Sequence, residues 1–388
     1  MRILVAPCAY KGTLHASDLA KAIAQGIKQE FEQEIEQEDS LNFRELVIEL
    51  APVADGGDDT ISCLQLSLGG NFAYDTVSGP ISQPTYAAYL RLGRMAVVEL
   101  AQASGIAHLR ENQLAALQAN TFGTGQIVAR AIEAGATVIA ITLGGSASTD
   151  GGSAVLAALG AKFYNEAGKA ILTDGTVCGG SALLSIAHID LSELRRRIEG
   201  IEFLIATDVT NPLLGSQGAA AIFAPQKGAN SEEVEYLERS LEHFASVLEA
   251  ACQSDKSWRS FAGAGAAGGA GFGLALGLGA RFTSGFHWFA EQTNLVEKLN
   301  WCDLVIVAEG CLDSQSLAGK ASGEILKLAR AAGKVVVALP ACSQLTKEQE
   351  KQFAAVIATA SQDKLATLDS VKQAAQGLFK VSGVFSKN

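Results

Sequence analysis

Strand-like and helical segments alternate at both ends of this 388-residue chain, and this alternation limits the folds open to it. The apolar runs are 3–6, 46–50, 304–308 and 335–339, and helical patterns follow at 17–32, 60–68 and 324–331. Such alternation predicts a mainly parallel sheet covered by helices on both faces.

The middle of the chain has a different pattern. Three successive strand-like runs at 71–77, 85–92 and 96–100 are separated by Gly and Pro, which favours antiparallel or mixed pairing. Further on, a long amphipathic helix is expected over 231–250, with Asn230 and Glu233 placed as a capping box. We therefore expect a first domain formed by residues 1–78 plus 287–388, and a second α/β domain inserted at 79–286.

Composition narrows the class of protein. The chain is 48% hydrophobic and 18% charged, as in ordinary globular proteins, and it has a net charge of −11 without a Lys/Arg run. Nucleic acid and anionic membranes are therefore not expected as partners. Seven cysteines without CxxC spacing argue against a disulfide framework and a zinc site, and favour a reducing compartment. With no signal-peptide pattern at Met1–Pro7 and no long apolar stretch, the expected location is cytoplasmic.

The loop Leu143–Gly152 joins a strand-like run at 138–142 to a helical run at 154–159. Its four glycines allow positive φ angles and let the backbone approach a ligand closely. The N-terminus of the following helix would direct free N–H groups and a positive dipole end toward an anion. The loop therefore favours an anion site. A tight βα turn without a ligand is the alternative.

Acidic residues recur next to glycines or polar residues where the expected strands end. They are Asp55, followed by Gly56 and Gly57; Asp150; Asp208; and the pair Glu309 and Asp313. Ligands of open α/β sheets bind at the carboxyl ends of the strands, so these loops are expected to meet. A single Asp in a turn often only caps a helix or closes an Asx-turn. Five acids in matching positions favour a site.

These residue types suit phosphoryl transfer. That reaction needs cations and N–H groups for phosphate, carboxylate oxygens for Mg²⁺ and a base for the attacking hydroxyl. Lys11, Lys227 and Lys320 each neighbour a glycine in an expected loop, although a single loop lysine is usually only solvated. The chain has no GxxxxGK[ST] motif, which argues against a Walker-type ATPase.

Other chemistries find less support. The GxGxxG match at 263–268 has neither a convincing strand before it nor a ribose-binding acid after it, so close helix packing or a ligand loop is preferred to a dinucleotide site. The five histidines are scattered, and no HExxH or GxSxG is present. Hydrolysis through zinc or a serine nucleophile is therefore not expected.

In order along the chain, the motifs resemble those of the bacterial glycerate kinase family, the type without a P-loop, glycerate 2-kinase-like. The resembling segments are 7–13, 52–60, 99–105, 123–125, 144–152, 208–213 with 225–228, 263–271, and 309–315 with 319–320. The resemblance implies a flavodoxin/Rossmann-like parallel-sheet domain with a second α/β domain inserted into it, and an active site in the cleft between them. It also implies ATP- and Mg²⁺-dependent phosphorylation of a glycerate hydroxyl, with 2-phosphoglycerate favoured over 3-phosphoglycerate.

Loop position and residue chemistry give the expected roles. Lys11, Asp208, Asp313 and Lys320 are expected to be catalytic, with either aspartate as base or Mg²⁺ ligand. The expected substrate- and nucleotide-binding residues are Asp55, Gly56, Gly57, Gly144, Gly145, Ser146, Asp150, Asn211, Lys227, Glu309 and Gln315. The expected partner is a small hydroxy acid, and a homodimer is a further expectation.

The chain departs from the family pattern near the expected strand ends of the first domain. Cys8 stands where the family has Asp, and Cys311 stands where it usually has Arg. Ser322 lies at or next to a usual Pro, and Pro340-Ala341 replaces Ala-Gly. These changes leave open a different hydroxy-acid substrate, or a non-catalytic protein that only binds the ligand. A dehydrogenase is a third reading.

Overall fold

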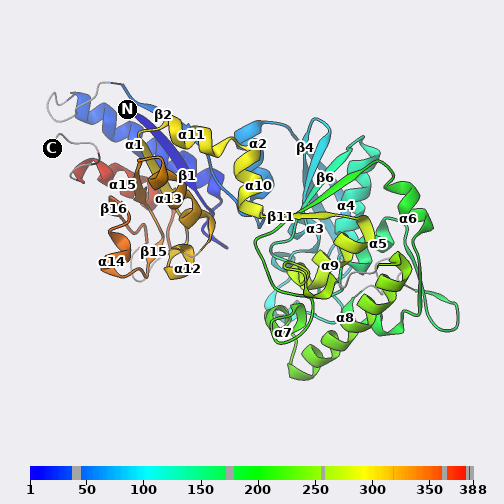
Figure 1. Cartoon of the computed structure of the whole chain (residues 1–388). Helices are drawn as coiled ribbons and strands as arrows, with labels where there is room; N and C mark the ends of the chain where they lie inside the picture. Colours follow the sequence, from blue (N-terminus) through cyan, green and yellow to red (C-terminus); the bar gives the residue numbers. More distant parts are fainter. Residues whose placement is uncertain are drawn as a thin grey trace. The chain divides into compact units, whose positions relative to one another are not determined.

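The computed structural model describes residues 1–36, 45–171, 179–254, 258–317, 319–360, 365–381 and 384. They form two compact units (Figure 1). Unit 1 comprises Met1–Asp55, Ser62–Gly69 and Phe286–Asn388, and unit 2 comprises Gly56–Ile61 and Gly70–Gly285. Among the described helices, none is long and apolar enough to cross a membrane.

Unit 1 is built on a five-stranded, fully parallel sheet in the order β16-β14-β12-β1-β2. Its strands are β1 (Arg2–Pro7), β2 (Val47–Leu50), β12 (Leu304–Ala308), β14 (Val335–Ala338) and β16 (Ala355–Val356). A separate parallel pair consists of β13 (Cys311–Leu312) and β15 (Cys342–Ser343). The helices are α1 (Ala16–Glu36), α2 (Thr60–Leu68), α10 (Gly285–Gln292), α11 (Leu295–Trp301), α12 (Ser314–Leu317), α13 (Ala321–Ala331), α14 (Lys347–Glu350) and α15 (Leu368–Gly377).

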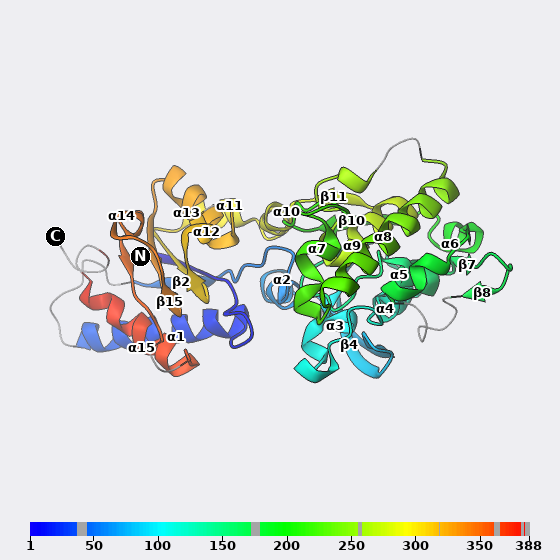
Figure 2. The same cartoon turned by 90° about the horizontal axis from the view of Figure 1, so that it is seen from below.

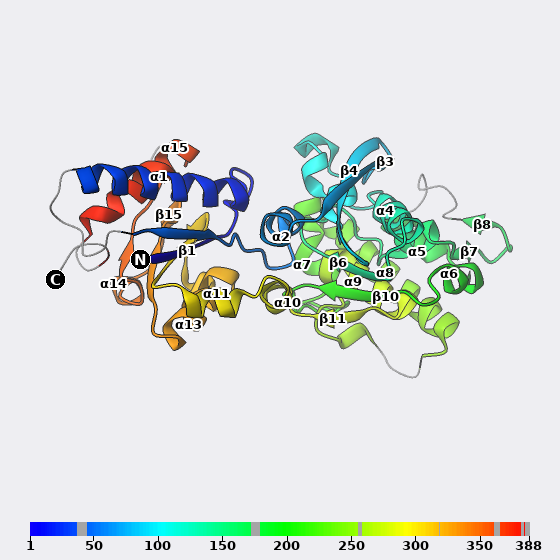
Figure 3. The same ribbon diagram turned by 90° about the horizontal axis from the view of Figure 1, so that it is seen from above.

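Helices cover both faces of this sheet, as the alternating sequence pattern predicts. Helices α1 and α15 lie on one face, and α11 and α13 lie on the other (Figures 2 and 3). Ile3 and Val5 of β1 pack in one core with Ile23 of α1 and Val371 of α15. Helices α1 and α15 are in close contact, because a Cβ on Gly26 would lie 2.4 Å from a backbone oxygen of α15.

Unit 2 contains a six-stranded mixed sheet in the order β11-β10-β6-β5-β4-β3. Strands β11, β10, β6 and β5 pair in parallel, and β4 pairs antiparallel with β5 on one side and with β3 on the other. The strands are β3 (Asn71–Ser78), β4 (Pro84–Leu92), β5 (Met95–Glu99), β6 (Val138–Thr142), β10 (Glu202–Ala206) and β11 (Arg281–Thr283). A small antiparallel sheet joins β7 (Lys162–Tyr164), β8 (Ala170–Ile171) and β9 (His188–Asp190).

The helices of unit 2 supply most of its core. They are α3 (Ala101–Ser104), α4 (Phe122–Glu133), α5 (Ser153–Ala158), α6 (Ser192–Arg197), α7 (Ala219–Phe223), α8 (Ser231–Cys252) and α9 (Ala266–Leu278). Phe244 of α8 meets Phe272 of α9 edge to face, with ring centroids 6.3 Å apart. The capping box of α8 is confirmed, because Asn230 and Glu233 exchange hydrogen bonds of 3.0 and 2.9 Å.

The division into units differs from the expected one at two segments. Strand β3 pairs with β4 along its whole length, from Asn71 with Arg91 to Ser78 with Pro84, and so belongs to unit 2 rather than to the first domain. The turn 56–61 also belongs to unit 2. Expectation and structure differ because a strand run alone does not reveal which sheet it joins.

Candidate active site

The loops after β1 and β12 start side by side in unit 1. Pro7 is in register with Ala308, and the N–H of Cys8 donates a 2.7 Å hydrogen bond to the Ala308 carbonyl. Tyr10 is buried and donates from its hydroxyl to the Leu339 carbonyl at 2.6 Å, which anchors the first loop to the residue directly after β14. The parallel register therefore brings the loop that carries Lys11 next to the loop that begins at Glu309.

Asp313 is held at the start of the short helix α12. Its Oδ1 accepts a 2.8 Å hydrogen bond from the backbone N–H of Ser316, and Lys320 Nζ lies 3.5 Å from the same oxygen. These contacts, above all the hydrogen bond from Ser316, lower the pKa of Asp313. An ionised carboxylate and an exposed ammonium group thus lie together at this edge of unit 1.

Glu309 and Cys8 are both affected mainly by burial. Glu309 is only 8% exposed, and within the described part of the chain its Oε1 has no hydrogen-bond partner. Burial raises the pKa of Glu309. The Cys8 thiol lies 3.7 Å from the Ser322 hydroxyl, and burial, followed by the charges of Glu309 and Asp55, raises its pKa. Cys8 is therefore a neutral thiol at neutral pH.

The structure brings together most of the predicted residues of unit 1. The charges of Lys11 and Asp55 act on Cys8, and those of Lys320 and Asp313 act on Glu309. Lys11 and Gln315 are exposed, and Asp55 is partly buried. Unit 1 thus presents several acids and two exposed lysines at the carboxyl edge of its sheet.

In unit 2, the loop Leu143–Gly152 is held by a buried lysine. Lys227 is 2% exposed, and its Nζ donates to Ser146 Oγ at 2.8 Å and to the Ser148 carbonyl at 2.5 Å. Burial lowers the pKa of Lys227 to about 7, although the charge of Asp150 opposes that shift. The ammonium group of Lys227 is thus bonded to the loop itself, and the ligand contact expected from the sequence stays a prediction.

Asp150 also lies inside unit 2. It is fully buried and accepts hydrogen bonds from Thr121 N at 2.8 Å, Thr121 Oγ1 at 2.7 Å and Gly152 N at 3.2 Å. Burial raises the pKa of Asp150, against the effect of these hydrogen bonds. The carboxylate ties the end of the loop to the start of α4, and the ligand contact expected from the sequence stays a prediction.

Three loops of unit 2 approach each other backbone to backbone. A Cβ on Gly144 would lie 2.5 Å from Gly57 Cα, and one on Gly56, which has a φ of 81°, would lie 2.6 Å from the Ala206 carbonyl oxygen. Only glycine fits such contacts. The expected binding residues Gly56, Gly57 and Gly144 are therefore gathered at the carboxyl ends of β6 and β10.

Glu99 is a functional candidate that the sequence reasoning left without a role. It ends β5, is 3% exposed, and accepts hydrogen bonds from Ile61 N at 2.7 Å and Gln102 Nε2 at 3.0 Å. Burial raises the pKa of Glu99 to about 7. Its place at a strand end in the segment 99–105 was the signal that could have found it.

Asp208 follows β10 and remains exposed. Its Oδ1 accepts hydrogen bonds from Ser284 Oγ at 2.7 Å and Gly285 N at 3.0 Å, both just beyond β11. Asn211 uses its side-chain amide to bind the Gln217 carbonyl at 2.8 Å, which shapes the loop rather than leaving that group open. Asp208 is thus the accessible carboxylate of this loop.

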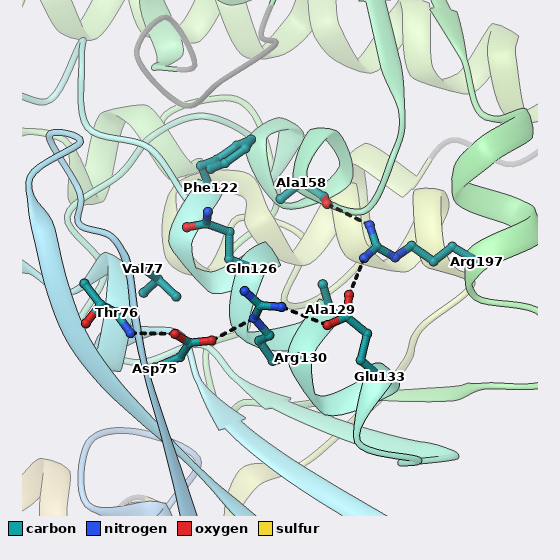
Figure 4. A pocket seen from close by; sticks show the side chains of 10 residues that line it. All are labelled: Asp75, Thr76, Val77, Phe122, Gln126, Ala129, Arg130, Glu133, Ala158 and Arg197. Carbon is teal, nitrogen blue, oxygen red and sulfur yellow. Dashed lines mark hydrogen bonds and ion pairs between the residues drawn. The ribbon is translucent and has the colours of Figure 1, made fainter.

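A hollow of about 230 Å³ elsewhere in unit 2 is set apart from these loops (Figure 4). Arg130 binds Asp75 at 2.7 Å and Glu133 at 3.0 Å, and Arg197 binds Glu133 at 2.8 Å. The two guanidinium charges are matched by two carboxylates. None of the predicted site residues lines this hollow, so we interpret it as a structural ion-pair network.

Fold and loops together define a two-unit α/β protein with acid- and glycine-rich loops at the carboxyl ends of parallel strands. The model of the glycerate kinase family matches residues 3–383. A glycerate 2-kinase of Escherichia coli (strain K12) is 36% identical over 345 residues, which are 87% of this chain and 84% of that protein. A glycerate kinase of Bacillus subtilis (strain 168) is 36% identical over 332 residues, which are 85% of this chain and 82% of that protein.

A solved structure from Salmonella typhimurium LT2, named provisionally as glycerate kinase 2, superposes with a TM-score of 0.80. It is 32% identical, and the match covers 97% of each chain. The chain therefore belongs to the glycerate kinase family and is an enzyme, a kinase, of that family. The resemblance inferred from the motifs and the expected α/β fold class are both confirmed.

Proposed function

We propose that the chain transfers the γ-phosphoryl group of ATP to a hydroxyl of glycerate, with Mg²⁺, and that 2-phosphoglycerate is the favoured product. The observation that carries the proposal is the ionised Asp313 beside Lys320 at the carboxyl edge of unit 1. Phosphoryl transfer depends on positioning and charge compensation, and this pair offers both signs of charge. The names of the relatives, glycerate kinase and glycerate 2-kinase, support the substrate and the preferred hydroxyl.

In unit 1, the proposed roles follow from charge and burial. Asp313 holds the attacking hydroxyl or serves as a metal ligand, and the exposed Lys11 and Lys320 compensate phosphate charge. Glu309 offers its unpartnered Oε1 to a hydroxyl proton of the substrate. A buried acceptor without a partner is costly, so a ligand that donates to it is favoured there.

In unit 2, we propose that the exposed part of the Leu143–Gly152 loop contacts the ligand and that the buried part holds it in place. Gly144, Gly145 and the turn at Gly56–Gly57 supply backbone N–H groups that suit phosphate oxygens. Lys227 and Asp150 are positioning residues, since both are buried beneath the loop. Asp208 is the candidate metal ligand of this unit.

The residues fit Mg²⁺ as a partner of the nucleotide. Among the described residues, no group of three or more His, Cys, Asp or Glu side chains could hold a metal ion. Magnesium in nucleotide sites usually takes one or two protein carboxylates, with waters and phosphate oxygens completing its shell. Asp208 or Asp313 satisfies that need, and the ion would supply compensation of phosphate charge.

The test is direct. Purified protein is incubated with ATP, MgCl₂ and D-glycerate, ADP release is followed, and the product is identified by ³¹P NMR. The phosphorus of 2-phosphoglycerate couples to one methine proton and gives a doublet, whereas that of 3-phosphoglycerate couples to two methylene protons and gives a triplet. We expect ADP release and the doublet.

A ligand-binding protein without turnover is the second candidate, and Cys8 is the observation that favours it. A neutral thiol stands where relatives are expected to carry a carboxylate, so one acid is missing from the edge of unit 1. Calorimetric binding of D-glycerate without ADP release would support this candidate. Turnover of another small 2-hydroxy acid, but not of glycerate, would instead show a changed substrate.

A further inference from the structure

We propose that Cys311 and Cys342 form a thiol pair that a small disulfide converts into a reversible intramolecular disulfide beside the Asp313 loop. Both cysteines lie in unit 1, at the carboxyl edge of its sheet, one after β12 and the other after β14. The proposed modification is not a step of the kinase reaction, and its expected effect on turnover rests on the proposed function.

Strand pairing places the two residues in register. Strands β13 and β15 run parallel with Cys311 opposite Cys342, and the N–H of Cys342 donates to the Gly310 carbonyl at 3.1 Å. Neighbouring strands lie about 4.8 Å apart, which falls within the Cα separation of roughly 4.4–6.8 Å that a disulfide spans. Registered side chains of parallel strands project from the same face. Burial, followed by the neighbouring Cys342 thiol, raises the pKa of Cys311 to about 11.

Accessibility distinguishes Cys342 from the other thiols of the described residues. All six cysteines of the described residues are free; Cys342 is exposed, Cys311, Cys8 and Cys252 are partly exposed, and Cys63 and Cys302 are buried. Reactivity of a thiol toward a disulfide requires access. Cys342 is therefore the thiol that an external disulfide reaches first, and Cys311 is the neighbour placed to displace it.

The chemistry consists of two thiol–disulfide exchanges. The Cys342 thiolate attacks one sulfur of a small disulfide such as oxidised glutathione, forms a mixed disulfide and expels one glutathione thiolate. The Cys311 thiol then loses its proton to solvent, attacks the Cys342 sulfur and forms the Cys311–Cys342 bond, and the second glutathione leaves as a thiolate that takes up a proton. The two cysteines lose two electrons and two protons, and the glutathione disulfide gains them.

The cross-link would act on the site through the backbone. Cys311 lies between Glu309 and Asp313, and the N–H of Ala341 already donates to the Glu309 carbonyl at 3.0 Å. A disulfide would fix the 309–313 segment against the loop after β14. We expect kcat of the oxidised protein to fall about tenfold, because small displacements of reacting groups are costly.

The test uses the full-length protein treated with oxidised glutathione and digested under non-reducing conditions. We expect a mass loss of two hydrogens and one cross-linked peptide pair containing Cys311 and Cys342, reversed by a dithiol reductant. Cys311→Ser should stop at a stable glutathione adduct on Cys342, and Cys302→Ser, the matched control, should still form the cross-link.

A persistent glutathione adduct on Cys342 of the unaltered protein, or a cross-link between other cysteines, would overturn the proposal. A cross-linked protein with undiminished kcat would overturn the proposed effect of the disulfide on the site. Because the mass measurement does not depend on turnover, failure of the cross-link and failure of the kinase assignment are distinguishable.

Discussion

The ammonium group of Lys227 is buried beneath the glycine loop and donates to Ser146 Oγ at 2.8 Å and to the Ser148 carbonyl at 2.5 Å. One side chain thus holds two residues of the segment that we propose to contact the ligand. It comes from the short turn after α7, far away in sequence. The loop therefore owes its shape to this lysine as well as to its own glycines.

Replacement of Lys227 by Met keeps most of the apolar stem of the side chain and removes the ammonium group that donates both hydrogen bonds. The Ser148 carbonyl then loses a charged partner. We therefore expect the free energy of unfolding, measured in urea, to be about 1–3 kcal/mol lower than in the unaltered protein. Loosening of the loop should also raise KM. Lys298→Met, which removes a partly exposed ion pair with Glu49, is the control and should shift both quantities much less.

The lowered pKa of Lys227 predicts a pH dependence of stability. The pKa is about 7 in the folded protein against an ordinary value of 10.5, so between these values the unfolded chain binds more protons. Stability from this group therefore rises with pH across that window, by at most about 1.4 kcal/mol per pH unit. Urea unfolding between about pH 7.5 and 9.5, a range inside that window, should show this rise in the free energy of unfolding. The rise should be absent from K227M. An identical slope in both proteins would contradict it.

Glu99 predicts a pH dependence of stability with the opposite sign. Its pKa is about 7 in the folded protein against an ordinary 4.5, so the folded protein binds more protons between these values. Its contribution to stability is greatest at low pH and declines as pH rises toward 7, by about 3 kcal/mol at most. Glu99→Gln should remove this decline while keeping an oxygen for Ile61 N. Unfolding free energies that follow the same pH curve in both proteins would count against the assignment.

Cys8 is predicted to be dispensable as a base. Because its thiol is neutral, Cys8→Ser should leave kcat within about twofold of the original value. The hydroxyl still offers Ser322 a partner. A large loss of kcat in C8S, measured by ADP release, would show that the sulfur has a role that its raised pKa does not predict.

Asp313 and Asp208 are predicted to be needed for turnover. Asp313→Asn and Asp208→Asn keep the size of each side chain but remove its charge. We expect kcat to fall about 10²–10⁴-fold for the aspartate that serves as base or metal ligand. Asp303→Asn, at an exposed ion pair with Arg2, is the matched control and should remain active. Near-normal kcat in both D313N and D208N would refute the roles proposed for these residues.

Periodicity and turn residues predicted much of the fold. The strand and helix alternation of unit 1 and the capping of α8 follow from local pattern. The position of β3 in the sheet of unit 2 does not follow from local pattern, because periodicity does not identify the strand with which β3 pairs. For the glycines at 263–268, the sequence favoured close packing or a ligand loop over a dinucleotide site. The structure shows close packing, because a Cβ on Gly268 would lie 2.1 Å from the Ser148 carbonyl oxygen.

For the site, the sequence predicted strand-end loops but not burial within them. Asp150 and Lys227 are residue types that often bind ligands, yet their side chains are buried and form hydrogen bonds that hold the loop. Loops have no periodicity that would reveal this direction. Glu99 escaped notice for the related reason that its partner, Ile61 N, is distant in sequence.

The most direct test of the proposed kinase activity is the ³¹P NMR spectrum of the product formed from ATP, Mg²⁺ and D-glycerate by the unaltered protein. We expect stoichiometric ADP and a new phosphomonoester doublet from 2-phosphoglycerate. A triplet from 3-phosphoglycerate would contradict the preferred hydroxyl. Binding of glycerate with no ADP and no new phosphorus signal would contradict the kinase activity itself.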